Sequence, residues 1–133
     1  MTSRPARTVS ISVDRAPDVV YTYLTDPRHL PGWAPGFARS VHEQGDGWVV
    51  ETTAGPMRIE FAPANGFGVV DHRVTSDDGL DSVNPMRVIG NGDGSEVLFT
   101  LFWPAGIAVE EFQRDLDRVE ADLRALKRVL EGR

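Results

Sequence analysis

Residues Val109–Glu131 read VEEFQRDLDRVEADLRALKRVLE. The apolar residues of this stretch recur at alternating spacings of three and four and form one stripe along an α-helix: Val109, Phe112, Leu116, Val119, Leu123, Leu126 and Leu130. The same spacing would suit a coiled coil of about three heptads. A single helix attached to a sheet more often buries its stripe on that sheet, so we expect it to close over one.

The residues before this helix predict that sheet. A hydrophobic period of two runs from position 37 to position 103 and favours strands near residues 38–43, 48–53, 57–62, 67–75, 82–89 and 96–103. Asp-Gly and Asn-Gly turns separate most of these segments and adopt positive φ at little cost. Connections this short join antiparallel strands, because parallel strands need longer crossovers.

The first 35 residues predict one more strand and two short helices. Residues 8–13 alternate apolar and hydroxyl side chains, as a half-buried strand does. Pro17 suits the first turn of a helix that ends at the Asp26-Pro27 step, where a second short helix can begin and extend to Leu30. The predicted fold class is therefore α+β.

Composition limits the partners of the chain. Its formal net charge of −6 over 133 residues argues against nucleic acid and anionic membranes, which select for basic patches. The chain has no cysteine, so disulfides and zinc–thiolate sites are excluded. Without a signal-peptide pattern or an apolar run long enough to insert into a membrane, we expect a cytoplasmic protein. No linker or repeat interrupts the pattern, so we expect one domain over residues 1–133, with a core of about residues 8–131.

Several segments, taken together, are similar to those of a known superfamily. The chain resembles the START-like, or SRPBCC, superfamily, and in particular its small bacterial polyketide cyclase/dehydrase-like members. The segments that carry the resemblance are Val9–Leu24 with Asp26-Pro27, Leu30-Pro31-Gly32-Trp33, Asp71-His72-Arg73-Val74, Met86-Arg87-Val88, Gly94–Leu101, and Asp122-Leu123 with Leu126-Lys127.

The resemblance implies a helix-grip fold. In that fold a curved antiparallel sheet of about seven strands, two short helices after strand 1 and a long C-terminal helix enclose a ligand-sized cavity. The superfamily includes lipid carriers, plant hormone receptors, aromatase/cyclases, oxygenase subunits and quinone-binding proteins. The resemblance therefore implies an apolar ligand in a cavity and no particular reaction.

Alternation along the predicted strands selects the side chains that face inward. In residues 67–75, for example, Val70, His72 and Val74 share the apolar face, whereas Asp71 and Arg73 form a pair on the outer face. We expect Phe112 and Leu116 to cover the cavity opposite His72. The complete expected lining is Trp33, Trp48, Val50, Met57, Ile59, Phe61, Val70, His72, Met86, Val88, Phe99, Leu101, Phe112 and Leu116.

Three polar or aromatic residues allow more than one interpretation. His72 is either a core histidine satisfied by a backbone group, a ligand contact, or a general base with Tyr23 as acid or oxyanion donor. Trp33 forms either a lid over the cavity or a plug beneath its loop. The histidines lack the paired spacing of a metal site, and catalytic sequence motifs are absent, so we expect neither metal nor cofactor.

Three functions remain open. The first is binding or carriage of a small apolar or aromatic molecule, such as a lipid, a quinone or a polyketide, because the inward set is almost wholly apolar. The second is a polyketide cyclase or dehydratase with His72 as base. The third is a non-catalytic protein-interaction module. Leu98 and Phe102, on the opposite face of the last strand, favour either a homodimer or burial under a loop.

Overall fold

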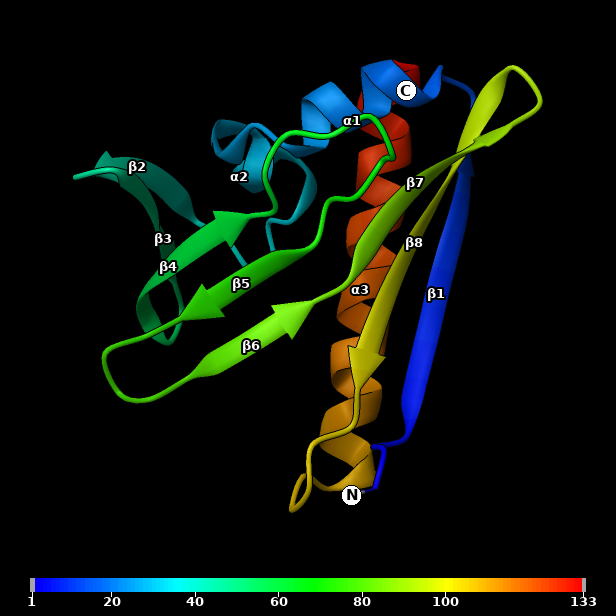
Figure 1. Cartoon of the computed structure of the whole chain (residues 1–133). Coiled ribbons are helices and arrows are strands. Elements are labelled where there is room, and N and C mark those ends of the chain that lie inside the picture. Colours follow the sequence, from blue (N-terminus) through cyan, green and yellow to red (C-terminus); the bar gives the residue numbers. More distant parts are fainter. Residues whose placement is uncertain (1, 133) are drawn as a thin grey trace.

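The computed structural model describes residues 2–132 of the chain. Met1 and Arg133, which the predicted domain includes, lie outside the described residues. Two antiparallel sheets, three short helical segments at one end and one long helix make up the α+β architecture (Figure 1). The long helix, orange to red in the figure, runs beside the three-stranded sheet, and the five-stranded sheet extends away from it.

The long helix α3, Val109–Glu131, begins and ends where the sequence predicted. The apolar stripe is buried from Phe112 to Leu130, and Leu126 is 0% exposed. Val109 is 54% exposed, so its predicted place in the stripe is wrong: it occupies the first turn, beyond the packed part of the helix. Gly132 ends the helix with a φ of 76°, the left-handed conformation that glycine adopts most readily.

The three-stranded sheet has the order β1-β8-β7 and packs against α3. Strand β1, Ala6–Val13, pairs along its whole length with β8, Gly94–Phe102. Strand β7, Met86–Asn91, pairs with the other edge of β8. The two longest strands, β1 and β8, come from the first and the last third of the chain. They lie side by side because both present an apolar face to α3.

The five-stranded sheet follows the chain in the order β2-β3-β4-β5-β6. Its strands are β2, Ser40–Gln44, β3, Gly47–Thr52, β4, Gly55–Phe61, β5, His72–Thr75, and β6, Asp81–Asn84. The prediction of one strand over residues 82–89 is wrong, since β6 and β7 belong to different sheets. Pro85 separates them because it lacks the N–H that would continue a ladder. The described residues therefore hold eight strands where about seven were expected.

Residues 67–71 join the two sheets without forming the predicted regular strand. Val70 donates to the carbonyl of Met86, and Val88 donates to the carbonyl of Gly68, each over 2.9 Å. Gly68 has a φ of +71°, and a Cβ atom there would overlap the carbonyl oxygen of Val88. Only glycine combines this conformation with so close an approach, which explains why the alternating pattern breaks here.

Three short helical segments close one end of the molecule. Helix α1, Pro17–Leu24, is followed by the 3₁₀ helix η1, Pro27–His29, and by α2, Leu30–Trp33. Val20 and Leu24 of α1 are 0% exposed, and Trp33 of α2 is 4% exposed. These residues belong to the same hydrophobic core cluster as strands of both sheets and α3.

Candidate functional site

A pocket of about 300 Å³ opens between the five-stranded sheet and the turn that follows α1. Thr25 and Pro27 form one wall, and Asp46 and Gly47, in the β2–β3 turn, lie beside it. Strands β3, β4 and β5 supply the remaining lining, which is Trp48, Arg58, Ile59, Glu60, Phe61, Arg73 and Thr75. The volume lies at the lower end of the range of small-molecule sites, and three of these side chains are large and apolar.

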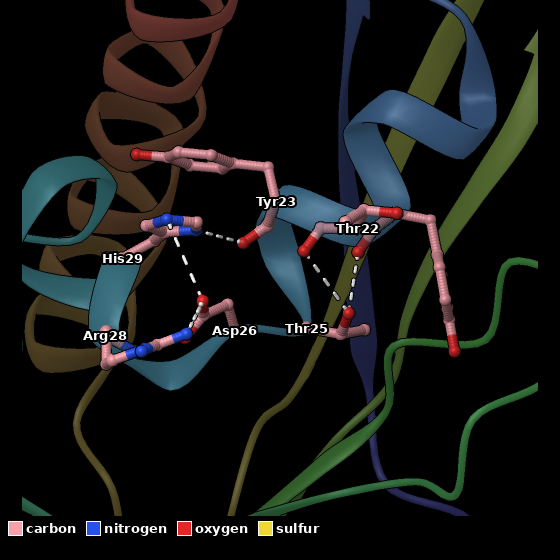
Figure 2. A network of polar contacts seen from close by, with 7 residues as sticks. Thr22, Tyr23, Thr25, Asp26, Arg28 and His29 are labelled. Carbon is pink, nitrogen blue, oxygen red and sulfur yellow. Dashed lines mark hydrogen bonds and ion pairs between the residues drawn. The ribbon is translucent and has the colours of Figure 1, made fainter.

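The wall at Thr25 and Pro27 is held in place by a polar network (Figure 2). Asp26 caps η1 by accepting from the backbone N–H of Arg28, and its carboxylate accepts two further bonds, of 3.0 and 2.8 Å, from the Arg28 guanidinium. The hydrogen bonds from the Arg28 side chain lower the pKa of Asp26 to about 2. The carboxylate is therefore charged at neutral pH, and it fixes the turn between α1 and α2.

His29 and Tyr23 extend this network. The imidazole of His29 stacks on the Tyr23 ring with centroids 4.2 Å apart, and Nδ1 bonds the backbone carbonyl oxygen of Tyr23 at 2.8 Å (Figure 2). Burial raises the pKa of the Tyr23 phenol. Within residues 2–132, Tyr23 makes no ring contact or hydrogen bond with His72. Tyr23 and His72, which the enzyme hypothesis needed as a pair, therefore belong to separate clusters.

His72 lies on β5, directly across from Phe61 on β4. Its ring centroid is 5.4 Å from that of Phe61 and 5.7 Å from that of Phe99, and the residue is 8% exposed. Nδ1 lies 3.0 Å from the carbonyl oxygen of Val70. Burial lowers the pKa of His72, so the ring is neutral at physiological pH.

Few of the predicted cavity residues line the pocket, although most of them lie in or against one hydrophobic core. Trp48, Ile59 and Phe61 line the pocket, and His72 touches it through Phe61. Seven others belong to the core cluster or pack against it: Val50, Met57, Val70, Met86, Val88, Phe99 and Leu101. Phe112 stacks on Trp103 at a centroid distance of 5.1 Å, and Leu116 is buried beside it on α3. Trp33 is buried, as a plug beneath its loop would be.

Sequence reasoning missed the polar part of the pocket. Thr25, Pro27, Asp46 and Gly47 lie in turns, which have no hydrophobic period to reveal their neighbours. Their residue types are typical of turns and gave no sign of a binding role. Nothing in the sequence indicated that the α1–η1 turn lies beside β3 and β4. Arg58, Glu60 and Arg73 also line the pocket. They alternate along their strands with inward residues, so the alternation rule places them on the outer face of the sheet.

A buried carboxyl group on α3 also went unpredicted. Asp122 is 9% exposed and lies next to Leu123 of the apolar stripe. Burial raises its pKa to about 6, an effect that the nearby Arg118 guanidinium partly offsets. A Cβ atom on Gly36 would lie 3.8 Å from the carboxyl Oδ1, so the loop after α2 covers this position.

Two properties of the described residues limit other kinds of site. Within residues 2–132, no group of three or more histidine or acidic side chains is placed to share a metal ion. The helices of the same range are too short or too polar for any of them to cross a membrane.

Comparison with known proteins gives one family and a set of similar structures. Residues 5–131 match the family described as "Polyketide cyclase / dehydrase and lipid transport". No curated protein sequence matches the chain.

The similar structures cover nearly the whole chain at low identity. An uncharacterised protein from Bacillus thuringiensis has a TM-score of 0.75 at 15% identity, over 95% of this chain and 98% of that one. A START superfamily protein from Mycobacterium smegmatis has a TM-score of 0.73 at 10% identity, over 96% and 97% of the two chains. DynU16, a protein of the dynemicin biosynthetic locus, has a TM-score of 0.69 at 20% identity, over 95% of this chain and 47% of its own. These likenesses establish a START-like, helix-grip fold.

Proposed function

The chain belongs to the family of polyketide cyclases/dehydrases and lipid-transport proteins, and we propose that it binds a small apolar or aromatic molecule in the pocket between β3–β5 and the α1–η1 turn. One observation carries the proposal: a pocket of about 300 Å³ is lined by Trp48, Ile59 and Phe61. The remaining lining is mostly polar, with the side chains of Thr25, Asp46, Arg58, Glu60, Arg73 and Thr75. Apolar and aromatic walls combined with placed polar groups are found in small-molecule sites.

The pocket wall supports binding because it is preformed. Asp26 and Arg28 hold the turn through a bidentate ion pair, and the Thr25 hydroxyl donates to the carbonyl of Tyr21 over 2.9 Å. A ligand therefore meets a wall that is already ordered. Less conformational entropy is lost on binding when the site is ordered beforehand.

The three tryptophans allow a direct test by NMR. Trp48 lines the pocket, whereas Trp33 is buried in the core and Trp103 stacks on Phe112. We expect 2-naphthol, a flat two-ring aromatic probe, to shift the indole N–H signal of Trp48 in a saturable titration and to leave that of Trp103 in place. Equal shifts of both indole signals, or no saturable shift at all, would contradict the proposal.

A pair of variants gives the matched control. Phe61→Ala removes a wall of the pocket and should weaken 2-naphthol binding by about 10-fold, because an aromatic wall contributes on the order of 1–2 kcal/mol. Phe102→Ala removes a phenylalanine that is 45% exposed and outside the pocket, so its affinity should match the wild type. Thermal unfolding of both variants verifies that each is folded.

A second candidate function, a polyketide-type cyclase or dehydratase, is favoured by the neutral, buried imidazole of His72. Such a ring can act as general base at Nε2 when Nδ1 is fixed by a carbonyl oxygen. In an aldol cyclisation it would remove a proton from carbon next to a ketone. If turnover of a linear polyketone is detected, His72→Leu should abolish it. Turnover that survives this substitution would exclude His72 as the base.

A further inference from the structure

The hydrogen bonding of His72 restricts the kind of molecule that its side of the pocket can accept. Nδ1 lies 3.0 Å from the carbonyl oxygen of Val70. A carbonyl oxygen can only accept, so Nδ1 carries the proton. In a neutral imidazole the other nitrogen, Nε2, then holds a lone pair and can only accept a hydrogen bond.

Nε2 has no partner within the described part of the chain. The one hydrogen bond of the His72 side chain is that of Nδ1, and two aromatic rings, those of Phe61 and Phe99, flank the imidazole. The residue is only 8% exposed, but Nε2 is not among the fully buried, unpartnered atoms of the described residues, so a small polar group can reach it. A ligand that covers this nitrogen without donating a hydrogen bond to it leaves it unpaired, which is unfavourable.

The position of His72 connects this free acceptor to the pocket. Phe61 lines the pocket and also contacts the imidazole, and the two residues are cross-strand partners, so their side chains share one face of the sheet. His72 is not itself a lining residue of the pocket, so a ligand reaches it only by extending past Phe61 along this face.

We propose that the pocket selects apolar or aromatic molecules that carry a hydroxyl group, such as a phenol, a hydroquinone or an enol, and that Nε2 of His72 accepts the hydrogen bond of that group. This inference rests on the proposed function. A ketone, a quinone or a methyl ether offers the same apolar surface without a donor. Such a ligand leaves Nε2 unpaired and places two acceptors against each other, so it binds more weakly.

The test compares two probes that differ by one methyl group, 2-naphthol and 2-methoxynaphthalene. Dissociation constants are measured by calorimetry on the wild-type protein, His72→Leu, His72→Gln and His42→Leu. His42 lies on β2, is exposed and does not line the pocket, so its replacement is the matched control.

We expect the wild type and the His42→Leu variant to prefer 2-naphthol by roughly 5- to 10-fold, the ratio that one hydrogen bond in a buried site produces. His72→Leu should bind both probes with equal affinity. His72→Gln keeps an acceptor oxygen and should retain part of the preference. Equal binding of both probes by the wild type, or an unchanged preference in His72→Leu, overturns the inference while the proposed function stands. If neither probe binds, the proposed function itself fails.

Nitrogen NMR provides a readout that does not depend on a variant. In the free protein, two-bond ¹H–¹⁵N spectra should show His72 with a protonated Nδ1 and an unprotonated Nε2. Saturation with 2-naphthol should move the Nε2 resonance toward that of a hydrogen-bonded nitrogen, and 2-methoxynaphthalene should leave it in place. A free protein with its proton on Nε2 would refute the proposed acceptor.

Discussion

At the residue scale, the exposed ion pairs contribute less to the stability of the fold than the buried groups do. Asp71 pairs with Arg87 on β7, at 3.0 Å, and Arg73 pairs with Asp81 on β6, so the predicted pair between Asp71 and Arg73 is wrong. Each acid is held by an arginine from a neighbouring segment. These ion pairs are largely exposed and contribute little to stability, roughly 0–1 kcal/mol each.

Asp122 is the residue whose charge state should affect stability most clearly. Its pKa of about 6 in the folded protein lies above the ordinary value of an unfolded aspartate, about 3.9. The folded state therefore binds this proton more tightly. Its stabilising effect is fully present below about pH 4 and is lost as the pH rises to about 6. Above that pH the buried charge lowers the free energy of unfolding by on the order of 2 kcal/mol.

Asp122→Asn should accordingly raise the free energy of unfolding at pH 7.5 and remove the decline in stability between pH 4 and pH 6. Urea denaturation at several pH values measures both effects. The control is Asp117→Asn, on an exposed position of the same helix, which should follow the wild-type pH profile. A wild-type stability that is constant from pH 4 to pH 7 would show that Asp122 titrates normally.

At the element scale, the connections between strands determine how the strands divide into two sheets. Pro85 divides one apolar run between two sheets, and residues 68–70 reconnect those sheets through their backbone bonds to β7. Asn65 organises the same loop: its side-chain oxygen accepts from the N–H groups of Phe67 and Val69, and its own N–H donates to the Tyr21 hydroxyl. The loop is thus built from polar contacts that no hydrophobic pattern reports.

Gly68→Ala should destabilise the protein by at least about 1–2 kcal/mol, because an alanine at positive φ is strained and its Cβ would meet the carbonyl oxygen of Val88. Gly66→Ala, two residues earlier in the same loop, meets open space and should change stability by less than about 0.5 kcal/mol. Thermal unfolding compares the two variants. A Gly68→Ala protein as stable as Gly66→Ala would mean that the joint between the sheets is flexible.

At the scale of the whole molecule, one hydrophobic core unites α1, α2, both sheets and α3. Leu126 lies in this core at 0% exposure, and Val129, three residues later, is 46% exposed. Leu126→Ala should lower the free energy of unfolding by about 2–5 kcal/mol, since it leaves a cavity in the common core. Val129→Ala should change it by less than about 0.5 kcal/mol.

Denaturation followed by two probes tests whether the core acts as a unit. Far-ultraviolet circular dichroism reports the helices. Tryptophan fluorescence reports Trp33 in the core, Trp48 in the five-stranded sheet and Trp103, which stacks on Phe112 of α3. We expect both signals to shift together to lower urea in Leu126→Ala. If the fluorescence transition stays in place while the helical signal moves, the five-stranded sheet folds independently of α3.

The sequence by itself determined those features whose cause is local. The stripe of α3, the helix start at Pro17, the Asp26-Pro27 break and the inward set Val70, His72 and Val74 follow from periods and turn chemistry. Apart from Val109 at the start of the stripe, each was found where it was predicted. The family followed from the same segments. Periodicity succeeds here because one buried face imposes its repeat on every residue of the element.

The tertiary structure alone decided the site. It placed Thr25 and Pro27 opposite β3 and β4, left His72 behind Phe61 with one nitrogen unpaired, and buried Asp122 in an apolar stripe. It also divided the strand at Pro85 and used Gly68 to join the two sheets. The physical reason is that these features depend on which distant segments meet. A local pattern fixes the direction of a side chain, whereas its burial, its partners and its pKa depend on the packing of the whole chain.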